Sequence, residues 1–178
     1  MEKEEDKSIP EIQSFLQNEY EGDMDCTLVS IMTVTKYFNK TITDISKLYN
    51  DIKAIAKKFF YTDDIGTQAI FINAIANRIF KQYGVNLKSK SAYLKSIGWN
   101  FETVKKSIDK GRPLILSLWK DGRDYYLDHS VTIIGYSDIK TVDGQHHKFL
   151  EIYDNWNREL TYIDYQKLST ICSINYFV

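Results

Sequence analysis

Three residues that lie far apart in this chain have the side chains that a thiol nucleophile requires. Cys26 opens a helical pattern, His129 begins a strand-like run much later, and Asp154 ends the next strand-like run. A cysteine becomes nucleophilic when a helix N-terminus and a histidine favour its thiolate, and when a third group orients that histidine. The residue types and their order therefore predict nucleophilic attack by Cys26 on a carbonyl substrate.

A helical first half must position Cys26. Apolar residues recur there at steps of three and four, which predicts four helices, at 26–38, 45–59, 68–83 and 101–108. Thr43 or Asp44 is expected to cap the second helix, Thr67 is expected to cap the third, and Gly84 ends it. The first helix places Cys26 at its N-terminus, where unpaired backbone N–H groups favour an anion.

A strand-rich second half must position His129 and Asp154. After Gly111 the pattern changes to short apolar runs, at 113–119, 128–136, 148–154, 161–163 and 173–178. Asp143-Gly144 is a hairpin signal between the second and third runs. Neighbouring strands lie about 4.8 Å apart, so His129 and Asp154 can face each other. Helices followed by strands predict an α+β fold, with an N-terminal helical lobe packed on a C-terminal antiparallel sheet.

Length and charge exclude several classes of protein. A chain of 178 residues suits one domain, which we place at 10–178 after a flexible tail at 1–9. With 23 basic and 24 acidic residues, the net charge of -1 argues against a nucleic-acid partner. Apolar runs are too short for a membrane span. Because the charged start lacks the apolar core of a signal peptide, we expect a cytoplasmic protein, or a secreted one if a signal was removed.

The remaining thiol and histidines give only weak signals. Cys172 lies within the last strand-like run and is expected to be structural. His146 and His147 are adjacent in a polar hairpin, which is a weak indication of metal binding. The Cys and His residues have no zinc-ligand spacing, so no metal or organic cofactor is predicted.

Four segments resemble the papain-like cysteine peptidases, and most closely the bacterial branch related to bacteriocin-leader-processing peptidases. They are LQNEY at 16–20, DCTLVS at 25–30, DHSVTIIGY at 128–136 and YDNW at 153–156. The order of Gln, Cys, His and then Asn or Asp agrees with that family. The resemblance covers residues 10–178 and implies a papain-like fold.

The resemblance also implies a role for each matching residue. Gln17 would donate to the oxyanion, Cys26 would be the nucleophile, His129 the general base and acid, and Asp154 the group that orients His129. We expect Cys26 and His129 to form a thiolate–imidazolium pair that attacks a peptide or protein substrate. Asp154 is preferred to Asn155 because it stands two residues before a tryptophan, as the family's Asn does.

Two departures from the family pattern leave alternatives open. Gln17 stands nine residues before Cys26, which resembles the longer loop of the bacterial branch, and Asn18 competes for the oxyanion role. Thr27 replaces the glycine that often follows the cysteine. Thr27 and the acidic loop before Cys26 would also suit an inactive papain-like domain that binds or regulates. An acyltransferase could use the same triad, because the triad does not itself select water as the acceptor. Oligomeric state and cleavage specificity are not predicted.

Overall fold

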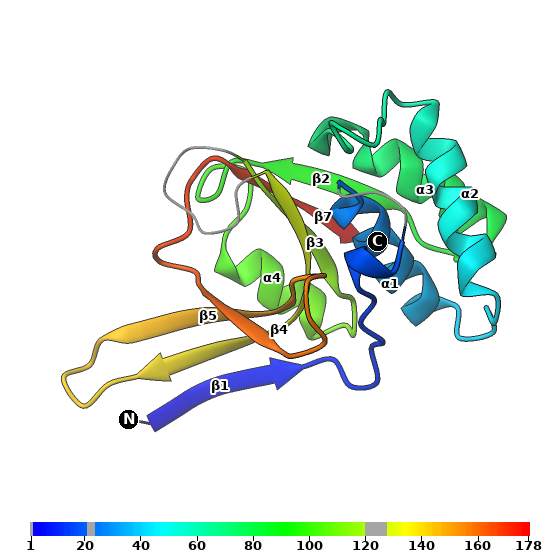
Figure 1. Cartoon of the computed structure of the whole chain (residues 1–178). Helices are drawn as coiled ribbons and strands as arrows, with labels where there is room; N and C mark the ends of the chain where they lie inside the picture. Colours follow the sequence, from blue (N-terminus) through cyan, green and yellow to red (C-terminus); the bar gives the residue numbers. More distant parts are fainter. Residues whose placement is uncertain (1, 21–23, 120–127) are drawn as a thin grey trace.

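The computed structural model describes residues 2–20, 24–119 and 128–178, in which helices pack on one antiparallel sheet (Figure 1). The predicted α+β class, with a helical lobe before a sheet, is confirmed. Three helices and two short 3-10 turns precede most of the strands: η1 at Gln17–Glu19, α1 at Cys26–Phe38, α2 at Ile45–Lys57, η2 at Ala69–Phe71 and α3 at Ile72–Gln82. No helix of the described residues is both long enough and apolar enough to cross a bilayer.

The ends of these helices test the predicted caps. Asp44 caps α2, because its carboxylate accepts a hydrogen bond of 2.8 Å from the backbone N–H of Lys47. Gly84 follows α3 with a φ of +66°, a conformation that glycine adopts without strain. Thr67 is wrong as the cap of the third helix: α3 continues from the turn η2, and Gln68 precedes that turn.

Helix α1 lies in the centre of the molecule and is buried on every side from Cys26 to Thr35. It contacts α2 and α3 on one side and the strands β3 (Leu114–Leu118) and β4 (His129–Lys140) on the other. Its apolar residues join those of α2 and α3 in one core cluster. The position of Cys26 is therefore determined by packing from both the helical layer and the sheet.

Among the described residues the sheet has seven strands: β1 at Glu2–Ser8, β2 at Ser89–Tyr93, β3, β4, β5 at His146–Tyr153, β6 at Thr161–Asp164 and β7 at Cys172–Phe177. All pairings are antiparallel, and the order is β2-β7-β3-β4-β5-β6, with β1 also pairing along β4. Strand β4 is long enough for its first half to pair with β3 and its second half with β1.

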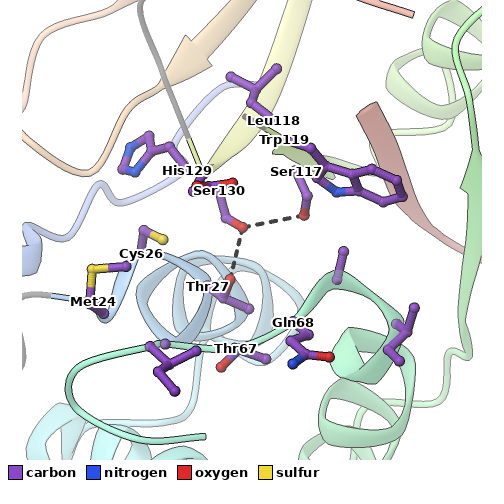
Figure 2. A pocket seen from close by; sticks show the side chains of 15 residues that line it. Met24, Cys26, Thr27, Thr67, Gln68, Ser117, Leu118, Trp119, His129 and Ser130 are labelled. Atoms are coloured by element: carbon purple, nitrogen blue, oxygen red, sulfur yellow. Dashed lines mark hydrogen bonds between the residues drawn. The ribbon is translucent and has the colours of Figure 1, made fainter. Parts of the chain in front are cut away.

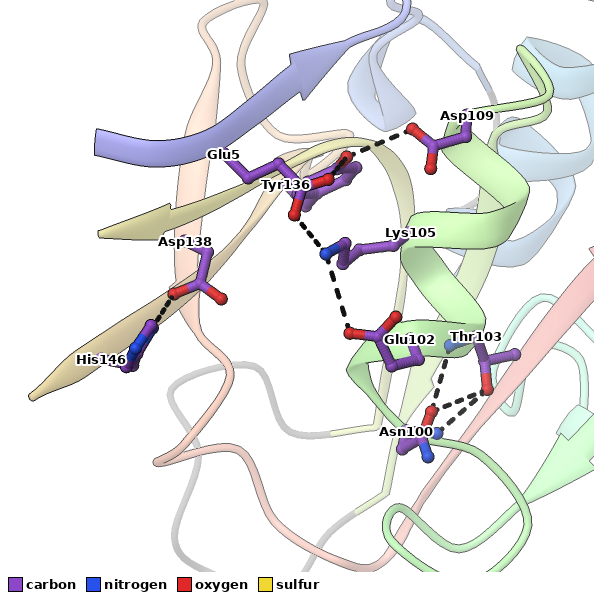
Figure 3. A network of polar contacts seen from close by, with 9 residues as sticks. All are labelled: Glu5, Asn100, Glu102, Thr103, Lys105, Asp109, Tyr136, Asp138 and His146. Atoms are coloured by element: carbon purple, nitrogen blue, oxygen red, sulfur yellow. Dashed lines mark hydrogen bonds and ion pairs between the residues drawn. The ribbon is translucent and has the colours of Figure 1, made fainter. Parts of the chain in front are cut away.

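The flexible tail predicted at 1–9 is wrong for residues 2–8, because they form β1. Its backbone pairs with the second half of β4, from Glu2 opposite Lys140 to Ser8 opposite Gly135. Side chains fasten it as well: the Tyr136 hydroxyl lies 3.2 Å from the Glu5 carboxylate and 3.2 Å from that of Asp109 (Figure 3). A charged segment without apolar periodicity gives no strand signal in the sequence. It forms a strand because β3 leaves the edge of the second half of β4 open, and that edge provides the backbone partners of β1.

The fourth predicted helix is confirmed as α4 at Phe101–Ile108, on the opposite face of the sheet from α1. Side chains alternate along each strand, so in β3 Leu114 and Leu116 join the cluster of α4 whereas Ile115 joins that of α1. The sheet is therefore the middle layer of this part of the molecule.

The predicted hairpin joins β4 to β5 and brings two candidate site residues to one end of the sheet. Gly144, with a φ of +83°, donates its N–H to the Thr141 oxygen at 2.8 Å. The register then pairs Thr132 with Tyr153. His129 at the start of β4 and Asp154 just after β5 consequently lie close together, next to the first turn of α1.

Candidate active site

Cys26 is the first residue of α1 and is buried, with 7% of its surface exposed. Burial raises the pKa of its thiol above the ordinary value, since the anion loses hydration. Hydrogen bonds to the thiol from the backbone and hydroxyl groups of Thr27 and Ser130 lower the pKa by less than burial raises it. Burial at this position therefore favours the thiol over the thiolate.

His129, the first residue of β4, is held in one tautomer. Its Nε2 lies 2.7 Å from the backbone oxygen of Asp154. A carbonyl oxygen only accepts, so Nε2 carries the proton and Nδ1 of the neutral ring is left with the lone pair of a base. The Trp156 ring covers the imidazole, with 4.3 Å between the ring centroids.

Burial also lowers the pKa of His129 below its ordinary value. The hydrogen bond to the Asp154 backbone and the charge of the Asp154 carboxylate raise this pKa, but by less than burial lowers it. A raised thiol pKa and a lowered imidazole pKa both favour the neutral forms. Both directions run against the thiolate–imidazolium pair that the sequence predicts, because desolvation outweighs the hydrogen bonds to the sulfur and to the ring.

Asp154 contacts His129 through its main chain, while its carboxylate shapes the turn that follows. Oδ1 accepts hydrogen bonds from the backbone N–H groups of Trp156 at 2.9 Å and Asn157 at 3.1 Å. Oδ2 accepts from the Asn157 side chain at 3.1 Å. The structure thus brings Asp154 to His129, as the sequence order suggests, and the ring Nε2–H donates to the backbone oxygen of Asp154.

The two candidate oxyanion donors differ in their surroundings. Gln17 is half-buried, and its backbone N–H donates to the Asn155 oxygen at 2.8 Å, which fastens η1 to the turn after β5. Asn18 is exposed.

Hydroxyl groups connect the nucleophile helix to the strands. Thr27 Oγ1 lies 2.8 Å from Ser130 Oγ, which in turn lies 3.3 Å from Ser117 Oγ (Figure 2). These side chains are buried between α1, β3 and β4. Thr27, in the position where a family glycine is common, therefore has a specific partner in the residue next to His129. Periodicity alone does not reveal this, because a small polar residue on a buried helix face resembles a break in the apolar pattern.

A buried carboxylate lies directly before the nucleophile. Asp25 has no exposed surface, and the hydroxyls of Tyr49 on α2 and of Tyr61 donate to its carboxylate. Lys53 pairs with Asp63 at 2.7 Å, and an Asp63 carboxylate oxygen lies 2.8 Å from the same Tyr61 hydroxyl, whose single hydrogen is shared between the two carboxylates. The sequence shows Asp25 only as part of an acidic loop. The structure shows that it ties the start of α1 to the helical layer.

A cavity of about 420 Å³ opens beside Cys26 and His129 (Figure 2). One wall comes from the segment between α2 and α3, and the other from the ends of β3 and β4. Its lining combines apolar and polar residues: Met24, Cys26, Thr27, Ile65, Gly66, Thr67, Gln68, Ala69, Ile70, Ser117, Leu118, Trp119, Asp128, His129 and Ser130. Ile65 and Ile70 are exposed, so this wall offers apolar surface to a bound molecule.

The other cysteine and His146 lie outside the lining of this cavity. Cys172 is buried in β7 and its thiol donates to the Ser169 oxygen at 3.2 Å. His146 Nδ1 lies 2.8 Å from an Asp138 carboxylate oxygen, between β5 and β4 (Figure 3). Across residues 2–20, 24–119 and 128–178, no three Cys, His, Asp or Glu residues gather as metal ligands would.

Comparisons with known proteins give a family match and matches to solved structures. A model of the Peptidase_C39 like family matches residues 10–170. The crystal structure of a candidate C39-like peptidase from Bacillus anthracis aligns with a TM-score of 0.60 and 16% identity, over 97% of this chain and 98% of that chain. SERA5E from Plasmodium falciparum aligns with a TM-score of 0.46 and 12% identity, over 98% of this chain and 92% of that chain. Among curated proteins, none matches. At 16% identity the Bacillus anthracis structure shows a shared fold alone.

The pKa directions predict how alkylation of Cys26 depends on pH. Only the thiolate reacts with iodoacetamide, so a raised pKa shifts the rise in alkylation rate to alkaline pH, above the ordinary value of a free thiol. We expect the native chain to show this alkaline rise, measured for Cys26 by mass spectrometry of its peptide. His129→Ala should leave the rise alkaline, because a neutral ring contributes no charge to the thiolate.

Two references accompany that measurement. Cys26 in the urea-unfolded chain should titrate as an ordinary thiol, and Cys172 reports on general opening of the fold. A rate that is already high at mildly acidic pH, and that His129→Ala abolishes, would contradict the neutral pair and restore the ion pair.

Proposed function

This chain belongs to the Peptidase_C39 like family, and we propose that it is a cysteine peptidase with Cys26 as its nucleophile. One observation carries the proposal: a helix-terminal cysteine and a histidine with a defined tautomer line the same cavity. The family and the fold support a peptidase. The assignment of the nucleophile, the triad and the acyl-enzyme is our inference from the geometry.

Attack and proton transfer would occur together, because burial favours the neutral forms of both side chains. As Cys26 Sγ bonds to the carbonyl carbon, His129 Nδ1 takes the thiol proton and becomes positively charged. The Asp154 backbone oxygen accepts from Nε2 of the resulting imidazolium, and the nearby carboxylate charge stabilises it. A base whose pKa lies below neutrality is unprotonated at pH 7 and ready to accept this proton.

The tetrahedral oxyanion would be held by the backbone N–H of Cys26 and the side-chain amide of Gln17. The first N–H groups of a helix have no intrahelical partner, so that of Cys26 is available. When the C–N bond breaks, the His129 imidazolium protonates the leaving amine. A water molecule, deprotonated by His129, then hydrolyses the thioester and frees Cys26.

Burial of Cys26 favours one alternative, a papain-like domain that binds peptides without cleaving them. A thiol with a raised pKa is a poor nucleophile until a base removes its proton. Such a domain would hold a peptide in the cavity and release it unchanged, which the first test below detects.

Peptide hydrolysis by the native chain tests the proposal. We expect the chain to generate new termini in a mixture of unstructured peptides, detected by mass spectrometry. Cys26→Ala should lower the rate at least about 10³-fold, because the nucleophile is lost. Cys172→Ala is the matched control and should retain the native rate. Peptides that bind the native chain without being cut would overturn the peptidase in favour of the binding domain.

The oxyanion assignment has its own pair of variants. Gln17→Ala should lower kcat about 10²- to 10³-fold, the usual effect of removing one oxyanion donor. Asn18→Ala should leave kcat nearly unchanged, since Asn18 is exposed. Steady-state kinetics on one cleaved peptide measures both, and the reverse result would transfer the role to Asn18.

A further inference from the structure

Asn155 lies between the elements that carry the nucleophile and the base, and it has no exposed surface. Its side-chain Nδ2 donates to the Cys26 oxygen at 3.2 Å and to Ser30 Oγ at 2.9 Å, both on α1. Nδ2 also lies 2.8 Å from the Ser130 oxygen on β4, so the two amide hydrogens are shared among three acceptor oxygens. One amide group therefore links the nucleophile itself to the residue that follows His129.

The backbone of the same turn reaches the other two parts of the site. The Asn155 oxygen accepts from the Gln17 N–H at 2.8 Å, and the Asp154 oxygen before it accepts from His129 Nε2 at 2.7 Å. The turn after β5 is thus in hydrogen-bond contact with η1, α1 and β4.

Two properties of asparagine are needed here together. The φ of Asn155 is +65°, a left-handed conformation that Asn tolerates better than most residues. Its amide supplies two hydrogens to acceptor oxygens. Aspartate of the same shape would present a carboxylate to three oxygens, and glycine would keep the conformation but lose the link.

The arrangement has a cost that its donor contacts must offset. Asn155 Oδ1 is buried without a hydrogen-bond partner among the described residues. Such an acceptor is destabilising. Stability alone does not favour a buried acceptor without a partner. Holding α1 next to β4 requires only the amide hydrogens of Asn155.

We propose that Asn155 is a positioning residue that sets the spacing between Cys26 and His129 and fixes Gln17 beside them. This inference rests on the proposed peptidase function. It places Asn155 outside the reacting atoms, since its contacts are with the main chain of Cys26 and Ser130 and with the Ser30 hydroxyl.

The test compares Asn155→Gly with a control at the other end of the same helix. Asn39 follows α1, and its side chain donates to the Tyr83 oxygen at 2.7 Å, far from the cavity. Asn155→Gly should lower kcat about 100-fold with KM nearly unchanged, because misplacement of reacting groups on this scale costs about that factor. Asn39→Ala should lower the thermal midpoint but leave kcat and KM at native values.

Two further variants separate the amide hydrogens from the backbone conformation. Asn155→Asp should lose as much kcat as Asn155→Gly, since it keeps the shape without the donors. Asn155→Ser keeps one donor and should retain more kcat than Asn155→Gly. If Asn155→Gly or Asn155→Asp fails to fold, Asn155→Ser is compared with the native chain in its place. Native kcat in Asn155→Asp, or equal kcat in the serine and glycine variants, would overturn the proposal.

Alkylation of Cys26 keeps this result distinct from the proposed function. Asn155→Gly should raise the iodoacetamide rate at Cys26 about tenfold, because the start of α1 is released from β4, whereas Asn39→Ala should not. If the native chain cleaves no peptide, the peptidase proposal fails and the alkylation rates alone decide on Asn155. Equal rates in the two variants would overturn its positioning role.

Discussion

Removal of water from Cys26 and His129 is the constraint on which the rest of the site depends. Helix α1 is surrounded by α2, α3 and the sheet, so even its first residue is buried. The charged form of either side chain is poorly hydrated there. Burial therefore raises the pKa of Cys26 and lowers the pKa of His129, and both shifts favour the neutral form. Burial therefore favours a mechanism in which charge develops as the sulfur attacks the substrate carbonyl.

The groups around the pair suit that requirement. The Asp154 backbone oxygen accepts from Nε2 in both protonation states, so His129 can gain a proton at Nδ1 without turning. Thr27 and Ser130 place hydroxyl and backbone groups near the sulfur. Groups fixed in advance stabilise a developing charge without reorganisation, which is where enzymes obtain much of their rate. The same rigidity explains why the turn at Asn155 must be tied to three separate elements.

Much of the fold could be predicted because local physics and tertiary packing agree. Helix α2 forms where its apolar residues recur at steps of three and four, and Asp44 caps it as its side chain favours. The turn at Gly144 likewise has a conformation that glycine favours. β1 could not be predicted, since its charged residues have no strand periodicity and the partner strand lies more than 100 residues away. The start of α3 was misplaced because the turn η2 intervenes after Thr67, and a short 3-10 turn leaves little trace in apolar spacing.

The candidate site divides in the same way. The order of Gln17, Cys26, His129 and Asp154 suggests which residues meet. The structure brings His129 next to Asp154, and Gln17 next to Asn155. The use of a backbone oxygen toward His129 has no signature in side-chain identities. Asn155 looked like a competitor of Asp154, because only the folded chain shows an amide placed among three acceptors from two elements.

Capture of an acyl group on Cys26 tests the central claim most directly. The native chain would be mixed with a p-nitrophenyl ester of an N-acetylated amino acid, quenched in acid within one turnover, and digested for mass spectrometry. We predict an acyl group on Cys26 that hydroxylamine removes, with none on Cys172 and a strongly reduced amount in His129→Ala. Release of p-nitrophenol with no acyl group on Cys26, or acylation that does not depend on His129, would contradict the account.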